Sequence, residues 1–298
     1  MNDRLRFAAF GGGLVVLFGA ALGIGALVGD PSPASSHDTS QSRTDQHDAF
    51  GLDASASGYT LGEISAPSTA HQPGVLSFRI TGPSGTVTAY DEQHEKDLHL
   101  IVARTDAGQY RHVHPELAAD GTWSIDWTWK EPGTYRVFAD FAPTGGPGGL
   151  TLSRTVTVTG QTALQPLPPP SRTAEVDGYR VTLTGDLTTA GSRLGFTVTR
   201  DGEPVTDLRP YLGAYAHLVA LRAADLAYLH VHPQGEVGST PPGPEVAFHA
   251  EAPTAGEYRL YLDFSHDNAV HTAEFTIAAT AAPVPADPGG LGEHEGGH

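Results

Sequence analysis

Three histidines occur twice in this 298-residue chain with identical spacing. Intervals of thirteen and two residues separate the members of each set, which are His99, His112 and His114 in the first half and His217, His230 and His232 in the second. Three imidazoles without a thiolate are a suitable ligand set for Zn²⁺ or Cu²⁺. The chain has no cysteine and its single methionine is Met1, which excludes a blue-copper site and a methionine-rich Cu⁺ site. The pattern therefore predicts one Cu²⁺ or Zn²⁺ site for each set.

A β-hairpin over residues 98–115 would bring the first set together. If the turn comprises residues 105–108, His99 lies directly opposite His114 and His112 lies one diagonal step away. All three side chains then share one face, because strand side chains alternate with a period of two. Opposed Cβ atoms lie about 4.5–5.5 Å apart, from which two imidazoles can reach one ion at about 2.0–2.1 Å each.

The same count predicts that His217 lies opposite His232 in the second set. Asp140 and Asp263 occupy matched positions after matched glycines and are candidates for a fourth ligand or for an acceptor that fixes a histidine tautomer. The sequence leaves both roles open. It also leaves open an ion pair between each aspartate and the arginine four residues before it.

A structural role for the histidines is the main alternative to metal binding. Ile101 and Val219 share the faces that carry the histidines, so a half-buried cluster bonded to carbonyls, aspartates or tyrosine hydroxyls also fits the pattern. Three histidines at fixed spacing in each copy favour the metal site, because a protein core rarely needs more than an occasional histidine.

The repeated histidines are part of a longer duplication. An offset of 118 residues relates positions 78–115 to 196–233 without a gap, and an offset of 123 relates 133–141 to 256–264. Self-similarity of this kind indicates a duplicated domain. Each copy has about 100 residues, which is enough for a core of its own.

The pattern within each copy predicts short strands. Runs rich in Val, Ile, Thr and aromatic residues alternate with Gly, Pro and Asp, and about seven such runs fall in each copy. We therefore expect an all-β fold of two tandem immunoglobulin-like or cupredoxin-like β-sandwich domains after one N-terminal transmembrane helix. Tyr135 and Tyr258 are expected to form a corner hydrogen bond. Trp123, Trp127 and Trp129 are expected in the core, with an exposed recognition patch as the alternative.

The N-terminal segment predicts export. Residues 8–28 carry no charge and are long enough to span a bilayer, so we expect an uncleaved anchor, with a cleaved signal peptide as the alternative. Arg4 and Arg6 place the N-terminus in the cytoplasm, which predicts a single-pass protein of the cell membrane with an extracellular C-terminal region. The expected organisation is a transmembrane anchor at 1–29, a disordered stalk at 30–58, repeat 1 at 59–160, a Pro-rich linker at 161–172, repeat 2 at 173–280 and a disordered, His-containing tail at 281–298.

Charge and motifs exclude several functions. The chain has 34 acidic and 17 basic residues, which gives a net charge of −17. Phosphate recognition in nucleic acids requires a basic surface, so we expect no nucleic-acid binding. No nucleophile motif, P-loop or dinucleotide-binding fingerprint is present, so we expect no enzyme. The expected partners are a metal ion, the membrane through the anchor and an exported protein.

The chain resembles CopC- and YtkA-like extracytoplasmic copper-handling domains in architecture and histidine content. Its Tyr-x-His-Val-His-Pro segments, at 110–115 and 228–233, also look like a motif of exported actinobacterial tandem β-sandwich proteins. The repeated histidines and the N-terminal segment, together with this resemblance, predict a membrane-anchored extracellular protein that sequesters or delivers Cu²⁺ or Zn²⁺. The alternative is a non-catalytic, immunoglobulin-like adhesion or scaffolding module with structural histidines.

Overall fold

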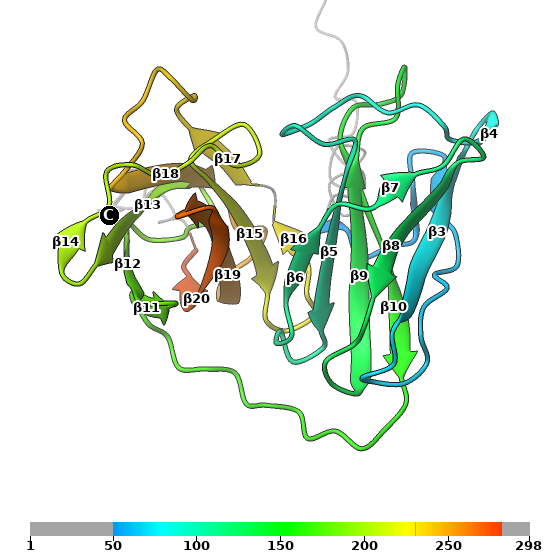
Figure 1. Ribbon diagram of the computed structural model, residues 1–298, viewed down its shortest axis with the longest axis horizontal. Coiled ribbons are helices and arrows are strands. Elements are labelled where there is room, and N and C mark those ends of the chain that lie inside the picture. The colour runs from blue at the N-terminus through cyan, green and yellow to red at the C-terminus, as the bar shows by residue number, and fades with distance from the viewer. Residues whose placement is uncertain (1–49, 230, 282–298) are drawn as a thin grey trace, which may run out of the picture. The chain divides into compact units, whose positions relative to one another are not determined.

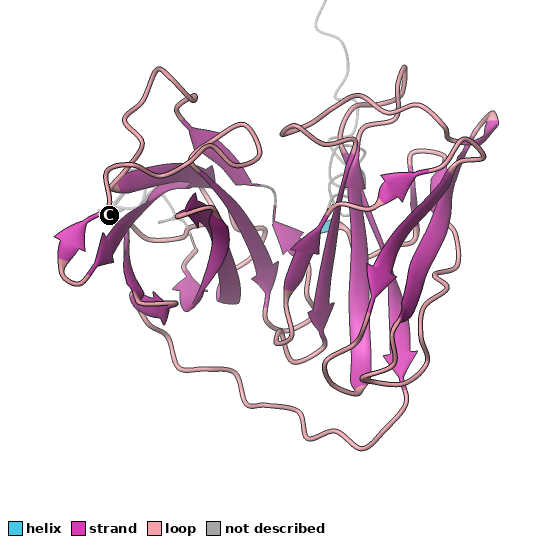
Figure 2. Cartoon of the chain, in the orientation of Figure 1, coloured by secondary structure: helices cyan, strands magenta, loops and turns pink. Residues whose placement is uncertain are grey.

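A computed structural model describes residues 50–229 and 231–281 of the chain. Every element named in this part is a strand (Figures 1 and 2). Among these residues, no helix has the length and apolar character needed to cross a bilayer. The predicted anchor, most of the stalk, His230 and nearly all of the tail lie outside the described residues. Both repeats belong to one compact unit of the chain.

The first repeat consists of two antiparallel sheets (Figure 1). One has the order β1-β2-β3-β8-β7 with β4 beside β3, and the other has the order β10-β9-β5-β6. The strands are β1 (Ser55–Ala56), β2 (Tyr59–Leu61), β3 (Gly74–Gly82), β4 (Gly85–Thr86), β5 (Leu98–Arg104), β6 (Arg111–Val113), β7 (Glu116–Leu117), β8 (Thr122–Trp127), β9 (Gly133–Phe141) and β10 (Leu150–Val158).

The second repeat repeats this arrangement, with sheets ordered β11-β12-β13-β18-β17, with β14 beside β13, and β16-β15-β19-β20. Its strands are β11 (Thr173–Val176), β12 (Tyr179–Thr184), β13 (Ser192–Arg200), β14 (Glu203–Pro204), β15 (Ala216–Arg222), β16 (Tyr228–Leu229), β17 (Val231–Gln234), β18 (Glu245–Ala250), β19 (Gly256–His266) and β20 (Ala269–Ala279). The all-β class and the two tandem two-sheet domains are confirmed.

Strand β5 is buried on both faces, which explains its mainly apolar sequence. Leu100 and Val102 point into the core of the first repeat, whereas Ile101 and Ala103 belong to a separate apolar cluster. The matched strand β15 divides in the same way, with Val219 in that separate cluster. His99 and His217 have the same strand parity as the residues of the separate cluster.

The apolar cluster that contains Ile101, Ala103 and Val219 joins the two repeats, and it is approximately symmetric. Tyr110 of repeat 1 stacks on Tyr261 of repeat 2, with ring centroids 3.8 Å apart. The matched pair is Tyr228 of repeat 2 and Phe138 of repeat 1, whose centroids are 5.7 Å apart. The Tyr261 hydroxyl also donates to the Ala107 carbonyl. Each repeat therefore contributes the same face, as in the isologous interface of a symmetric dimer.

The two predicted tyrosine hydrogen bonds are confirmed. The Tyr135 hydroxyl donates to the carbonyl of Glu131 at 2.7 Å, and the Tyr258 hydroxyl donates to the carbonyl of Thr254 at 2.9 Å. Both bonds reach four residues back along the chain and satisfy a buried polar atom.

The tryptophans pack in the core of the first repeat, as expected. Trp123, Trp127 and Trp129 are each 2% exposed. The indole of Trp129 donates to the Pro67 carbonyl at 2.8 Å, and that of Trp123 donates to the Tyr90 hydroxyl at 3.1 Å. The alternative of an exposed recognition patch is wrong.

A buried ion pair at the β5 hairpin should control acid stability. The guanidinium of Arg104 bonds both carboxylate oxygens of Asp106, at 3.0 and 2.7 Å, and both side chains are 4% exposed. Burial alone would raise the pKa of Asp106, but bonds from Arg104 and from the Gln165 and Gly108 amides lower it below its ordinary value. This stabilisation is present above the unfolded pKa of about 3.9 and is lost as the pH falls through the folded value.

We expect Arg104→Met to lower the free energy of unfolding by about 3–5 kcal/mol at pH 7, because it leaves a buried carboxylate unpaired. The difference from the wild-type chain should begin to narrow below about pH 4, where the unfolded chains take up the proton, and should narrow further as the pH falls through the lowered pKa of Asp106 in the folded wild type. Urea unfolding at pH 7 and pH 3 measures both effects. The exposed pair Arg79–Asp120 provides the control, since Arg79→Met should change little. A pH-independent difference would contradict the assignment.

Candidate metal centre

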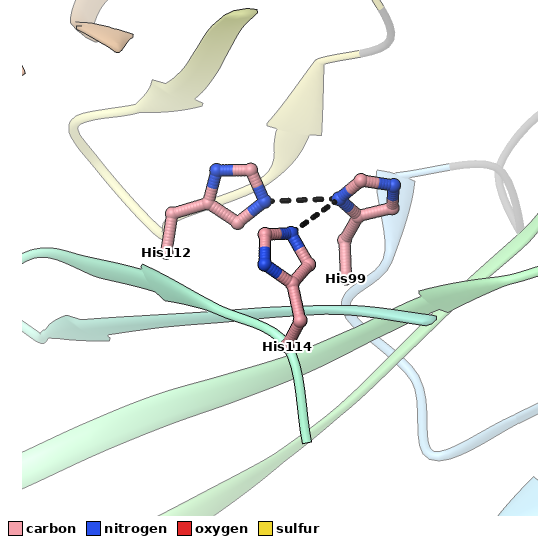
Figure 3. A group of neighbouring side chains, drawn as sticks. All are labelled: His99, His112 and His114. Atoms are coloured by element: carbon pink, nitrogen blue, oxygen red, sulfur yellow. Dashed lines mark hydrogen bonds between the residues drawn. The ribbon is translucent and has the colours of Figure 1, made fainter. Parts of the chain in front are cut away.

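The first histidine set converges at the edge of the β10-β9-β5-β6 sheet (Figure 3). Leu100 pairs with Val113 across β5 and β6, so His99 faces His114 as predicted, and this register is confirmed. Nδ1 of His99 lies 3.0 Å from Nε2 of His112 and 3.2 Å from Nε2 of His114. One nitrogen from each of the three rings lies within 4.8 Å of the other two.

Outer hydrogen bonds determine which nitrogens hold protons. Nε2 of His99 lies 2.9 Å from the Gln93 carbonyl, which can only accept, so this nitrogen is the donor. Nδ1 of His112 donates in the same way to the Asp263 carboxylate at 3.0 Å. The inner nitrogens of His99 and His112 therefore both present lone pairs, and these face each other at 3.0 Å. Such a contact requires an electron-pair acceptor, either a proton or a metal ion.

The distances suit a metal ion. Two nitrogens bound to Zn²⁺ at about 2.0–2.1 Å with a tetrahedral angle are about 3.3 Å apart, close to the observed 3.0 and 3.2 Å. Burial lowers the pKa of His99 to about 4 and that of His114 to about 3, and repulsion from His112 lowers both further. Without a metal, His114 can donate to His99, and the inner lone pair of a neutral His112 ring then faces no donor among the described residues.

Asp263, from the second repeat, holds His112 in position. Its Oδ2 accepts from His112 and lies 3.5 Å from the Tyr110 hydroxyl, while its Oδ1 accepts from Thr272 at 2.6 Å. The carboxylate is 3% exposed. A carboxylate behind a histidine fixes the ring orientation and raises its basicity toward a metal. Asp263 therefore has the geometry of an acceptor that fixes a histidine tautomer, as predicted, but the histidine that it holds is His112 of the first repeat.

Asp140 occupies a different position from Asp263 relative to the three histidines. It pairs with His99 across β5 and β9, and its carboxylate accepts from Thr151 at 2.8 Å. Burial and the nearby Asp140 carboxylate raise the pKa of Tyr228. Asp140 is thus the counterpart of Asp263 in the pseudo-symmetric interface, but it lies outside the group of three histidines.

The matched arginines have other partners. Arg136 donates to the Leu52 carbonyl and to Ser153, both at 2.8 Å. Arg259 donates to Thr276 and to the Glu274 carboxylate.

The second set does not form a matching site in the described residues. Val231, the counterpart of Val113, pairs with Ala250 in the other sheet, because the chain leaves β15 after the two residues of β16. His232 consequently pairs with His249 on β18 and is exposed. The prediction that His217 lies opposite His232 is wrong. His230 lies outside the described residues, so its predicted role stays a prediction.

His217 instead lies beside the first set. Its ring centroid is 4.8 Å from that of His112 and 5.5 Å from that of His99. His94, which is exposed, lies 5.6 Å from His217 and 6.1 Å from His99. Sequence reasoning missed His94 because position 212 in the second repeat is Leu, so the repeat pattern contained no signal for it. Burial, followed by repulsion from neighbouring histidines, lowers the pKa of His217 well below its ordinary value.

Comparisons with known proteins identify the family. The model of a family described as a domain of unknown function (DUF8832) matches residues 54–160 and 174–281. The chain belongs to this family. Its two matches agree with the duplication seen in the sequence. No curated protein matches the chain.

Solved structures share the β-sandwich character at low similarity. Invasin, a bacterial integrin-binding protein, is 11% identical with a TM-score of 0.25, and the match covers 76% of this chain but only 40% of invasin. The Escherichia coli adhesin FdeC is 14% identical with a TM-score of 0.24, covering 76% of this chain and 65% of FdeC. Domains 5–6 of the S-layer protein SbsC are 10% identical with a TM-score of 0.24, covering 75% and 99%. Scores this low carry no functional argument, and none of the three supports the resemblance to copper-handling domains.

Proposed function

We propose that this chain binds one Zn²⁺ or Cu²⁺ ion through His99, His112 and His114, with Asp263 supporting His112. The observation that carries the proposal is the 3.0 Å approach of His99 Nδ1 to His112 Nε2, while the outer nitrogens of the two rings face the Gln93 carbonyl and the Asp263 carboxylate. A divalent cation relieves the repulsion between the two inner nitrogens. Imidazole ligands suit both ions, so the donor set does not select between them.

The surroundings of the site favour reversible capture, either for sequestration or for delivery. His114 is only half-buried, so one side of the group is open to solvent. The net charge of −17 raises the local concentration of cations around the chain. With the predicted N-terminal anchor, the site would work at the outer face of the cell membrane. The proposal assigns binding to the chain and no catalysis.

The immunoglobulin-like description of the two sandwiches also belongs to the proposal. Each repeat has a tyrosine that bonds to the carbonyl four residues earlier, at Tyr135 and Tyr258. Immunoglobulin-like sandwiches use such a bond at the corner between two strands. This feature favours an immunoglobulin-like over a cupredoxin-like sandwich.

Titration tests the stoichiometry of the site. We expect one equivalent of Zn²⁺ or Cu²⁺ per chain, because the described residues assemble one set of three histidines. Isothermal titration of metal-stripped protein, followed by elemental analysis after desalting, measures this value. His232→Ala is the matched control, since its exposed position on β17 should leave the stoichiometry at one. Absence of binding at micromolar metal would refute the proposal.

A second candidate function is a non-catalytic adhesion or scaffolding module with structural histidines. The apolar interface between the repeats favours it, because Ile101, Phe138, Val219 and Tyr261 are each 0% exposed. In that case the histidines would add polar contacts beside the apolar cluster that joins the repeats. This candidate predicts that chelator leaves stability unchanged and that no metal co-purifies.

A further inference from the structure

We infer that the metal site is shared between the two repeats, with His217 of the second repeat as the fourth ligand. Metal binding would then clamp the repeats together. This inference rests on the metal site proposed above and adds the ligand and the consequence. It starts from His217, whose ring lies beside those of His99 and His112 and has no hydrogen bond within the described residues.

His217 is the one member of this group without a hydrogen bond in the described part of the chain. His99 bonds Gln93, and His112 bonds Asp263. In the same repeat as His217, the buried His266 and His271 each bond an aspartate, at 3.0 and 2.8 Å. A partly buried imidazole without a partner is unfavourable unless something else binds it. A metal ion held by its neighbours supplies that partner.

The ring of His217 lies close enough to those of His99 and His112 to supply a fourth ligand after a side-chain rotation, although its nitrogens lie outside the group of three that approach one another within 4.8 Å. For tetrahedral ligands with metal–nitrogen bonds of about 2.0–2.1 Å, ring centroids should be about 5 Å apart. The three rings of the first set are separated by 5.2, 5.0 and 4.9 Å. His217 is 5.5 Å from His99 and 4.8 Å from His112. Its ring is almost parallel to that of His99, so rotation about its Cβ–Cγ bond is needed to direct a nitrogen at the ion.

The backbone places His217 and Asp263 side by side, since the two are directly paired across β15 and β19. Asp263 already bonds His112 across the interface. The second repeat therefore contributes two residues to the proposed site, which are His217 as a ligand and Asp263 as the hydrogen-bond acceptor of His112. A ligand that binds the associated repeats more tightly than the separate ones favours their association by at most the ratio of the two affinities, so a fourth ligand that strengthens binding about 100-fold should tighten association by up to about 100-fold.

The first part of the test counts ligands in the full chain. X-ray absorption of the Zn²⁺-loaded protein should show about four imidazole ligands in the wild type and three with one oxygen in His217→Ala. Zn²⁺ affinity should fall by about 100-fold in that variant, with the stoichiometry still one. His217→Gln serves as the second variant, because it keeps a polar side chain if alanine disturbs the interface. His249→Ala on β18 is the control and should behave as the wild type.

The second part measures the clamp. A protease site placed within residues 163–170 allows the linker of the folded chain to be cut, and sedimentation then gives the affinity between the halves. Added Zn²⁺ should tighten that affinity by up to about 100-fold in the wild type and by much less in His217→Gln. If both variants bind Zn²⁺ as the wild type does, the shared site is wrong while the three-histidine site stands. If the wild type binds no metal, both proposals fail.

Discussion

Replacing His112 with alanine should lower the affinity for Zn²⁺ or Cu²⁺ by about 10³-fold or more. His112 is the central link of the site, since its Nε2 faces His99 while its Nδ1 bonds Asp263. Loss of an outer partner alone typically costs about 10–100-fold in metal affinity, and this substitution removes a ligand as well. Competition with a chromophoric chelator measures affinities over this range.

The substitution also leaves the buried Asp263 carboxylate without one of its donors. Metal binding could therefore be lost because the protein unfolds and not because a ligand is missing. His114→Ala separates the two effects, because the His114 ring bonds His99 rather than Asp263 and is half-buried. That variant should keep the unfolding midpoint of the metal-free protein and still lose most metal affinity. Asp263→Asn, which keeps the shape of the side chain, should lose about 10–100-fold. Wild-type affinity in folded His114→Ala would show that the three rings do not act together.

The local geometry of the first set was predictable because it depends on one turn. A four-residue turn at 105–108 determines the β5–β6 register, and the period of two then puts His99, His112 and His114 on one face. The second hairpin starts with the same register, with Ala220 opposite Leu229. It fails at the next step because β18 competes for residues 231–234. Competition between two sheets for one segment depends on tertiary packing, which spacing does not describe.

The participation of the second repeat could not be derived from spacing within either copy. Asp263 reaches His112 only because the two histidine-bearing faces pack together around Ile101 and Val219. A signal for this packing was present in the apolar run 98–103, interrupted only by His99, which is typical of a strand covered on both faces. The sequence indicates that both faces of such a strand are buried. It does not show that the second repeat buries the face that carries His99.

Val219→Asp should separate the two repeats without unfolding either one. Val219 is 0% exposed within the cluster that joins the repeats, so an aspartate there places an unpaired charge in an apolar interface at a cost of about 3–5 kcal/mol. The cores of the two repeats are separate clusters that do not contain Val219. We therefore expect one cooperative unfolding transition to become two, and the linker to become more sensitive to protease.

The matched control is Val270→Asp on β20, where the valine is 47% exposed and the same new charge meets solvent. It should leave a single transition. Separation of the repeats in Val219→Asp removes Asp263 from His112, so metal affinity should fall even though His99, His112 and His114 all remain in the chain. A variant that splits into two transitions yet binds metal as tightly as the wild type would show that the first hairpin alone forms the site and that the second repeat does not support it.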